Sequence, residues 1–296
     1  MNNPVMLSSY RPDPEDRLTS LYRDEGLSRE VIRLFRRIIR VQYRKAGRVQ
    51  PWRETSDPYH ILVSEIMLQQ TQVERVLGKY RQFITRFPDF HSLARAPLSS
   101  VLILWQGLGY NRRAVLLHRL AQQVVTLHGG LLPGEREALL GLPGIGPYTA
   151  GAVLAFAFNI PAVFIETNIR RVFLHFFFPD ETSVSDREIA PLVETTVDRR
   201  DPRSWYYGLM DYGSELKKKV ANPNRRSSHY TRQSPFEGSR RQVRARLLRL
   251  VLRHPGSTAA SLARLSEIET ALAREILREL AVEGFLVMKN RRYSAR

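Results

Sequence analysis

The chain of 296 residues contains no cysteine. Disulfides, thiolate-bound zinc and thiolate-bound iron–sulfur clusters are therefore excluded, because each needs cysteine sulfur. The chain also lacks an uninterrupted apolar run of about 18 residues, and its start lacks the basic and apolar regions of a secretory signal. We therefore expect a cytoplasmic protein that has no membrane contact, no bound metal and no cofactor.

Acidic residues are scarce. The chain has 29 Asp and Glu against 46 Lys and Arg, and its formal net charge is +17. This balance favours a polyanionic partner, most often nucleic acid, because basic side chains neutralise phosphates and release condensed counterions. A basic surface without such a partner is the plainer alternative. Charge alone says nothing about the fold.

Strand-like patterns are almost missing, whereas apolar residues recur at helical spacing through most of the chain. We therefore predict an all-α fold. The predicted parts are an N-terminal lead-in, a helical body, a basic loop and a basic C-terminal domain, at residues 1–27, 28–216, 217–236 and 237–296.

The C-terminal part holds 19 Lys and Arg against 6 Asp and Glu from residue 217 onward. Its helical patterns at residues 239–254, 258–265 and 268–283 are followed by two short strand-like runs at 284–288 and 291–294. Three helices followed by a hairpin are typical of a winged helix. We expect that architecture for residues 237–296.

Two glycines, Gly144 and Gly146, lie between apolar helical patterns in residues 139–172. Glycines this close together permit a sharp reversal, because glycine adopts positive φ without a steric penalty. Pro147 then suits the first turn of the next helix, whose free N–H groups favour a phosphate. A tight helix–helix turn without a ligand is the alternative.

This hairpin motif, LPGIGPYTAGAV, resembles the helix-hairpin-helix of the DNA glycosylase superfamily that includes endonuclease III. Two further motifs, SEIMLQQTQV at residues 64–73 and WQGLGYNRRA at residues 105–114, resemble its adenine-DNA glycosylase branch, the MutY type. The likeness covers residues 50–213, with the motifs in the family's order. It implies a helix-hairpin-helix glycosylase body, and double-stranded DNA with a mispaired or damaged base as partner. We expect a nucleoid-associated monomer.

Removing a base breaks an N-glycosidic bond while positive charge develops on the sugar. Such chemistry needs an acid at the leaving base and an anion near the sugar. Glu65 lies in an apolar helical segment, where burial would raise its pKa and retain a proton. A solvent-facing glutamate is the plainer alternative from spacing alone. The resemblance implies that Glu65 protonates the adenine ring.

Glu166 follows an apolar run and precedes a predicted helix, whose N-terminal field favours a carboxylate. The superfamily usually has Asp here. The additional methylene displaces the carboxylate, which puts the rate of catalysis in doubt. The resemblance implies that Asn168 supports this carboxylate. Tyr148 lies where bifunctional members carry a Schiff-base lysine, and a phenol cannot replace that amine. The resemblance therefore implies a monofunctional enzyme without lyase activity.

A target base must leave the stack, and the gap it leaves must be filled. The resemblance implies that Gln69, Gln70, Tyr110 and Asn111 probe the DNA. It also implies that Trp52 and Arg53 lie beside the flipped base, and that Asp211 is an acid at the side of the pocket.

Many superfamily members carry a four-cysteine iron–sulfur loop after this body, with six, two and five residues between the ligands. The same spacing counted on this chain gives Lys217, Asn224, Ser227 and Gln233. We therefore interpret residues 217–236 as a loop without a cluster. Its basic residues, free to contact phosphate, include Arg225, Arg226 and Arg232.

The resemblance thus implies a glycosylase that excises adenine opposite guanine or 8-oxoguanine. A basic domain replaces the C-terminal module with which many adenine glycosylases read 8-oxoguanine. An enzyme of the same fold that removes thymine or uracil opposite guanine is therefore an alternative. A non-catalytic binder of DNA structure is a further alternative, because Glu166 departs from the usual Asp.

Overall fold

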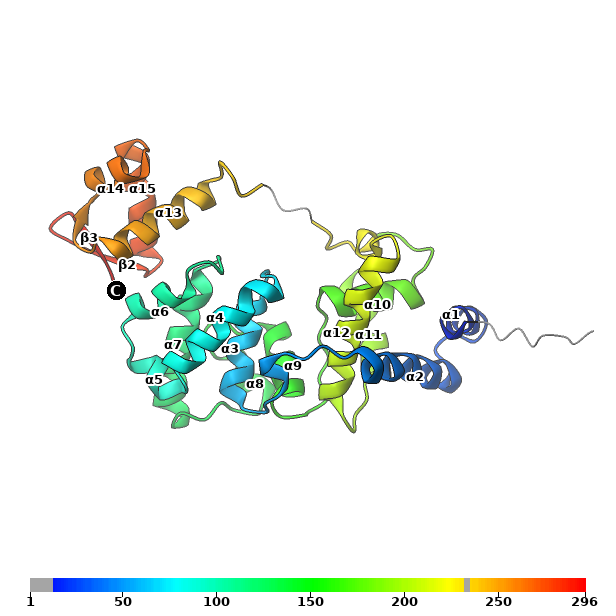
Figure 1. Cartoon of the computed structure of the whole chain (residues 1–296). Helices are drawn as coiled ribbons and strands as arrows, with labels where there is room; N and C mark the ends of the chain where they lie inside the picture. The colour runs from blue at the N-terminus through cyan, green and yellow to red at the C-terminus, as the bar shows by residue number, and fades with distance from the viewer. Residues whose placement is uncertain (1–12, 232–234) are drawn as a thin grey trace, which may run out of the picture. The chain divides into compact units, whose positions relative to one another are not determined.

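The computed structural model describes residues 13–231 and 235–296. These residues are almost entirely helical, with one small three-stranded sheet, which confirms the predicted all-α class (Figure 1). None of the described helices is long and apolar enough to cross a membrane. The chain divides into two compact units: Met1–Arg48 with Asn159–Thr231, and Val49–Phe158 with Arg232–Arg296.

The first unit is an aromatic-rich helical bundle. Phe35 at its centre meets the rings of Phe173, Phe177 and Trp205 edge to face, at centroid distances of 5.5, 5.0 and 5.6 Å. Such pairs add about 0.5–1.5 kcal/mol each beyond the area that they bury. The helices of the unit are α1 (Pro14–Glu25), α2 (Arg29–Ala46), α10 (Thr167–Phe177), α11 (Asp186–Thr196), α12 (Pro202–Lys219) and the 3₁₀ helix η2 (Pro223–Arg226).

Within the predicted N-terminal lead-in, residues 14–25 form helix α1. The Asp13 side chain accepts a hydrogen bond from the Glu15 N–H at 2.9 Å, which caps the helix. Leu18 is fully buried, and Tyr22 packs edge to face on Phe177. The apolar residues of this segment are few, but they face one side of the helix. The core of the first unit therefore orders a stretch whose composition is polar.

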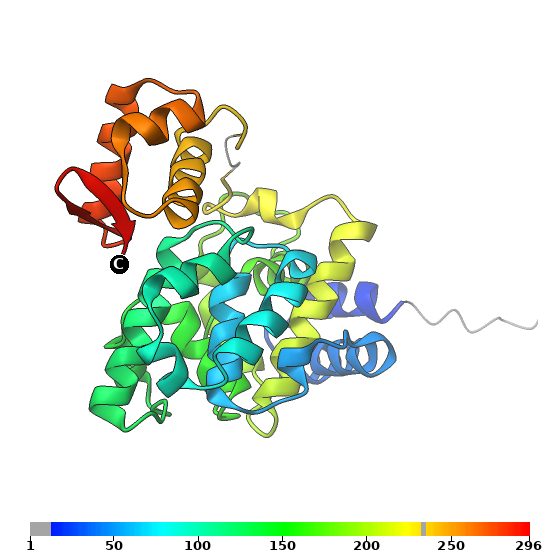
Figure 2. The same cartoon turned by 60° about the vertical axis from the view of Figure 1, so that its left-hand side comes forward.

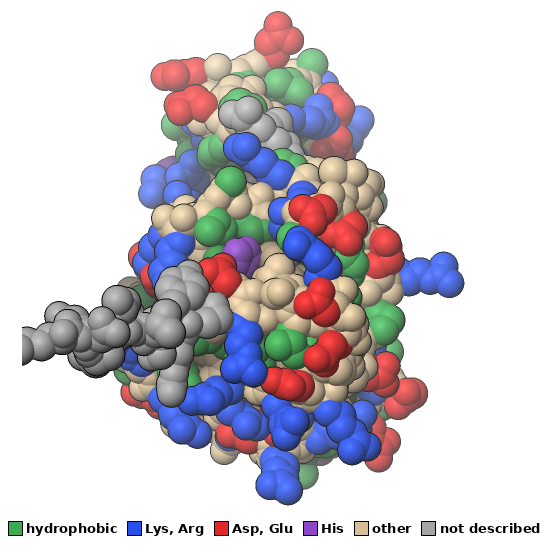
Figure 3. Space-filling view, turned by 90° about the vertical axis from the view of Figure 1, so that its right-hand side faces the viewer, with side chains coloured by type: hydrophobic (Ala, Val, Ile, Leu, Met, Phe, Trp, Pro, Cys, Tyr) green, Lys and Arg blue, Asp and Glu red, His purple; other side chains and the backbone are tan. Residues whose placement is uncertain are grey.

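Helix α2 presents arginines to solvent at helical spacing, namely Arg33, Arg37 and Arg44. Residues three and four apart share a helix face, so these guanidinium groups lie along one side. Figure 3 shows Lys and Arg side chains gathered along the lower edge of the face that it presents.

The second unit contains the helices that lie, in the sequence, between the two segments of the first unit, together with the C-terminal residues. Its helix α3 packs on α4, α7 and α9 (Figures 1 and 2). Helix α3 is apolar on nearly every side, which suits a central position. The elements are η1 (Pro51–Arg53), α3 (Pro58–Leu68), α4 (Val73–Arg86), α5 (Phe90–Arg95), α6 (Leu98–Trp105), α7 (Arg112–His128), α8 (Arg136–Leu140) and α9 (Pro147–Phe156).

The C-terminal residues form three helices and a sheet in the order of a winged helix. These elements are α13 (Arg240–Arg253), β1 (Ser257–Thr258), α14 (Ala259–Ser266), α15 (Thr270–Val282), β2 (Leu286–Lys289) and β3 (Arg292–Ala295). The predicted hairpin is present as the antiparallel pair β2 and β3. Strand β1, which pairs with β3, was not predicted, because two residues are too few to give an alternating pattern.

Candidate active site

Glu65 is buried in α3, with 3% of its surface exposed. The Tyr148 hydroxyl, in the first turn of α9, donates a hydrogen bond to its Oε2 at 2.8 Å. A protonated carboxyl group has one carbonyl oxygen that accepts and one hydroxyl that donates. The Tyr148 bond can occupy the accepting oxygen of such a group, so this arrangement is compatible with Glu65 as a general acid.

The same turn of α9 contacts the residue that follows α3. Gln69 donates from Nε2 to the Thr149 hydroxyl at 3.1 Å. Two adjacent residues of α9, Tyr148 and Thr149, thus bond to two residues of the SEIMLQQ segment, Glu65 and Gln69. The helix that follows the hairpin therefore fixes both the candidate acid and the first candidate DNA-probing residue.

Glu166 is the N-cap of α10. Its Oε1 accepts from the backbone N–H groups of Asn168 and Ile169 at 2.7 and 2.8 Å, and its Oε2 accepts from Asn168 Nδ2 at 3.2 Å. Burial raises the pKa of Glu166, while these backbone bonds and the charges of Arg171 and Arg170 oppose the rise. The carboxylate is thus held rigidly at a helix N-terminus.

Arg171 supports the pair of Glu166 and Asn168 through hydrogen bonds, a role that was not predicted from the sequence. It is 4% exposed, and its Nη1 donates to Asn168 Oδ1 and to the Gly213 carbonyl, each at 2.6 Å. Asn168 therefore keeps its amide nitrogen directed at Glu166. A Cβ at position 213 would lie 2.3 Å from the Asn168 carbonyl oxygen, so only glycine fits there. The one feature of the sequence that could have indicated this role is the second of the two arginines that follow Asn168.

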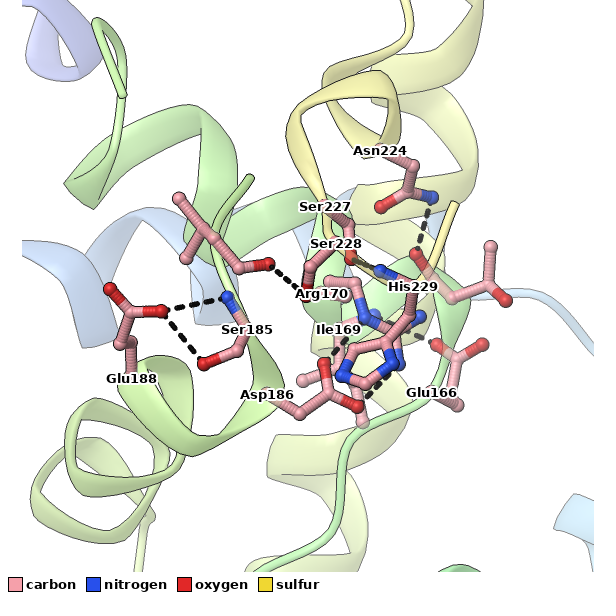
Figure 4. Close-up of polar contacts among 12 residues, drawn as sticks. Glu166, Ile169, Arg170, Ser185, Asp186, Glu188, Asn224, Ser227, Ser228 and His229 are labelled. Carbon is pink, nitrogen blue, oxygen red and sulfur yellow. Dashed lines mark hydrogen bonds and ion pairs between the residues drawn. The ribbon is translucent and has the colours of Figure 1, made fainter. Parts of the chain in front are cut away.

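Residues 220–231 of the predicted cluster-free loop are tied to α10 by hydrogen bonds, as Figure 4 shows, whereas residues 217–219 belong to the end of α12. Asn224 and Ser227 occupy two of the positions counted for cluster ligands, and both are buried. Asn224 Nδ2 donates to the Thr167 carbonyl at 3.0 Å, next to Glu166. Ser227 forms a parallel bridge with Val184. Among the residues that the structure describes, no group of three or more His, Asp or Glu is arranged to hold a metal ion.

Arg226 corrects one prediction. It was expected to be free for phosphate, but it donates to the carbonyls of Leu174 and Pro179 at 2.6 and 2.9 Å. It therefore caps the C-terminal end of α10, where carbonyl groups otherwise lack partners. Arg225 is exposed, as a phosphate contact requires. Arg232 lies outside the described residues.

The predicted hairpin is present between α8 and α9, and its two glycines differ. Gly144 has φ of +81°, and a Cβ there would approach Leu116 at 2.9 Å. Gly144 is therefore required for the backbone conformation of the hairpin turn. Gly146 is the N-cap of α9 in extended conformation, and a Cβ there would meet nothing within 4 Å. The backbone at Gly146 is therefore open to a ligand from outside.

We predict that Gly146→Ala leaves the melting temperature unchanged and weakens duplex binding about tenfold. A methyl group would fit the fold but block a phosphate from the N–H groups of α9, and a charge-assisted hydrogen bond contributes about 1.5–3 kcal/mol. Fluorescence anisotropy with a labelled duplex measures the change. Equal affinity of the variant and the wild-type protein would show that no phosphate binds here.

Gln70 and Tyr110 lie in turns and adopt positive φ, 54° and 46° respectively. Gln70 is exposed and Tyr110 is 40% exposed, as expected of residues that probe DNA. Asn111 precedes α7 directly. Positive φ is uncommon for residues with side chains and costs about 1–3 kcal/mol, so both turns need support from their surroundings.

Two other predicted residues have structural partners. Trp52 is 2% exposed and packs edge to face on Tyr80, so it belongs to the core and its predicted contact with a base is wrong for this structure. Asp211 is 4% exposed; its two oxygens accept from the Arg48 N–H and Nε at 2.9 and 2.6 Å. Arg53 ends η1 and is partly buried.

The candidate residues are divided between the two units. Glu65, Tyr148 and the two turns belong to the second unit, whereas Glu166, Asn168 and Asp211 belong to the first. Each unit by itself holds one of the two candidate catalytic carboxylates, Glu65 or Glu166, by hydrogen bonds. One is an acid within an apolar helix, and the other is an anion at a helix N-terminus. These are the two roles that cleavage of a glycosidic bond requires.

A family model described as HhH-GPD superfamily base excision DNA repair protein matches residues 63–195. The chain is also 34% identical over 167 residues to the thymine/uracil-DNA glycosylase of Methanothermobacter thermautotrophicus, covering 55% of this chain and 76% of that protein. The chain belongs to the HhH-GPD superfamily. A solved structure of a thermostable thymine-DNA glycosylase aligns with a TM-score of 0.56 at 31% identity, over 62% of this chain and 86% of that one.

Adenine relatives within the HhH-GPD superfamily match as well. The chain is 36% identical over 168 residues to the adenine DNA glycosylase of Buchnera aphidicola subsp. Baizongia pistaciae, covering 55% of this chain and 47% of that protein. It spans about half the length of the adenine glycosylases that it matches. The predicted superfamily is confirmed, and the relatives that resemble the chain are named for different target bases, adenine in one group and thymine or uracil in the other.

Proposed function

We propose that this protein is a monofunctional DNA glycosylase that hydrolyses the bond between adenine and deoxyribose, where adenine is mispaired with guanine or 8-oxoguanine. One observation carries the proposal. Glu65, within a segment that resembles the adenine branch, is buried and accepts a hydrogen bond from Tyr148. An adenine leaves readily only when a ring nitrogen gains a proton, and Glu65 has the surroundings of a proton donor.

In the proposed reaction, the flipped adenine takes the proton of Glu65 as the C1′–N bond breaks and its electron pair leaves with the base. The positive charge on the sugar is stabilised by the carboxylate of Glu166, which Asn168 and two backbone N–H groups hold in place. Water then bonds to C1′, and its proton passes to a carboxylate of the site. The products are free adenine and an abasic site.

The proposal of a monofunctional reaction rests on the residue at position 148. A Schiff base needs an amine, and Tyr148 has a phenol whose hydroxyl is already bonded to Glu65. The sequence has no lysine between Lys79 and Lys217, so none of the helices from α5 to α11 offers a substitute amine. Strand cleavage by the protein itself is therefore not part of the proposed activity.

A second candidate is removal of thymine or uracil opposite guanine. The observation that favours it is the share of each relative's length that this chain covers. The chain spans 76% of a thymine/uracil-DNA glycosylase and 86% of a thymine-DNA glycosylase of known structure, against about half of the adenine relatives.

Single-turnover assays on labelled duplexes test the two candidates. Each duplex holds one pair: A opposite 8-oxoguanine, A opposite G, T opposite G or U opposite G. Breaks that appear only after alkali, at the adenine pairs, support the proposal. Release of T or U supports the second candidate, and breaks without alkali contradict a monofunctional reaction. Tight duplex binding with no release at any pair would indicate a non-catalytic binder.

A further inference from the structure

A buried arginine, Arg113, lies at the start of α7 between two exposed turns. One turn (residues 69–72) joins α3 to α4 and carries Gln70, and the other (residues 106–111) joins α6 to α7 and carries Tyr110. Arg113 itself is 9% exposed. It is thus a charged residue enclosed by the second unit, beside the two residues expected to enter DNA.

The guanidinium of Arg113 bonds to the first turn through Nη1. This nitrogen donates to the carbonyls of Ile66, Met67 and Gln69 at 2.7, 2.9 and 2.6 Å. The last carbonyls of a helix have no partner within the helix, and Arg113 supplies one. The bond to Gln69 fixes the peptide unit directly before Gln70. The unusual φ of Gln70 is therefore held by a neighbour from α7.

The other terminal nitrogen of Arg113, Nη2, bonds to the second turn. It donates to the carbonyls of Leu108 and Gly109 at 3.3 and 3.1 Å, and to the Thr71 hydroxyl at 3.0 Å. The Thr71 hydroxyl in turn donates to the Leu108 carbonyl at 3.2 Å. One guanidinium group and one hydroxyl therefore join the two turns into a single unit.

The charge of Arg113 is retained in this position. Burial lowers its pKa to about 10, so the group stays protonated at neutral pH. Its Cζ lies 5.4 Å from the ring centre of Trp105 and 5.5 Å from that of Tyr110, within the range of a cation–π interaction. The contact with Tyr110 orients the exposed ring as well as its backbone.

We propose that Arg113 is a positioning residue for base flipping, which joins the Gln70 and Tyr110 turns so that both side chains enter the duplex together. The proposal rests on the proposed glycosylase function and adds the group that organises the step before chemistry. A planar guanidinium reaches acceptors on two sides at once, whereas a lysine ammonium is a single point of charge. Charge alone therefore does not suffice at this position.

The test compares Arg113→Lys with Arg112→Lys, a matched control at the exposed neighbouring position. We expect Arg113→Lys to lower the single-turnover rate about 100-fold on adenine paired opposite 8-oxoguanine, because misplacement by about 1 Å has effects of that size. On adenine opposite an abasic-site analogue, which is already unpaired, the loss should be less than about tenfold. Arg112→Lys should stay within about twofold on both substrates.

A merely structural role would lower both rates of Arg113→Lys equally, and that result would overturn the proposal. Combination with Tyr110→Ala gives an independent check. If Arg113 acts through Tyr110, the second substitution should add little to the first. Full additivity would contradict the proposed link. If Arg113→Lys fails to fold, Thr71→Val takes its place in the test. This substitution removes one acceptor and leaves the guanidinium in place, so it should shift the ratio of the rates on the two substrates in the same direction by a smaller factor.

Flipping is also measurable without catalysis. Fluorescence of 2-aminopurine at the target position rises when the base leaves the stack. We expect the wild-type protein and Arg112→Lys to raise it, and Arg113→Lys to raise it far less at saturating protein. If Arg113→Lys raised the fluorescence as much as the wild-type protein does, the proposal would be overturned. A wild-type protein that flips the base but releases none would contradict the glycosylase function and leave this measurement valid.

Discussion

Glu65→Gln should lower the single-turnover rate of adenine release about 1,000-fold, within the range expected for loss of a general acid. The glutamine keeps the size of the side chain, and its carbonyl oxygen still accepts the Tyr148 hydroxyl that lies 2.8 Å from Glu65 Oε2. The substitution therefore removes the proton and retains the packing. Rates on A opposite 8-oxoguanine, with duplex affinity measured in parallel, give the comparison.

Tyr148→Phe is the matched control for this prediction. It removes the hydrogen bond to Glu65 but not the acid, so the rate should fall by about tenfold, as expected for loss of one hydrogen bond. Duplex affinity should stay near that of the wild-type protein in both variants. An unchanged rate in Glu65→Gln would show that Glu65 is not the acid.

Glu166→Gln should lower the same rate about 100- to 1,000-fold, because it removes the negative charge that the developing cation on the sugar requires. The wild-type rate should also depend on pH in a defined direction. The charged form is the active form, so activity is present above the pKa of Glu166 in the folded protein and is lost as the pH falls through it. Since burial raises this pKa, the loss should begin above the pH at which an exposed glutamate protonates.

Glu166→Asp separates the charge from its position. Aspartate is the usual residue in the superfamily and a good N-cap, so it can accept from the N–H groups of Asn168 and Ile169. We expect it to retain at least about a tenth of the wild-type rate. A loss in Glu166→Asp as large as that in Glu166→Gln would show that Asn168, Arg171 and Gly213 are adjusted to the longer side chain. A pH profile of Glu166→Gln that matches the wild-type profile would assign the titration to another group.

The sequence was sufficient to predict the superfamily, the helical body and the C-terminal hairpin, because these depend on local patterns. The spacing of glycines around Ile145 predicts a reversal whatever surrounds it. Spacing alone left open whether Glu65 faces solvent, and the resemblance to the adenine branch favoured a buried acid; in the structure Glu65 is 3% exposed. The absence of cysteine excludes a thiolate-bound cluster without any knowledge of the fold.

Only the tertiary structure decided what the basic and polar side chains contact. Arg113 and Arg226 look alike in the sequence, yet one joins two exposed turns and the other caps α10. Their acceptors are backbone carbonyls, which every residue carries, so no pattern of side chains identifies them. Trp52 was expected beside a base and lies in the core, because the partner that buries it, Tyr80, comes from a different helix. Local chemistry thus determined which elements form, whereas the meeting of distant segments determined the role of each charged group.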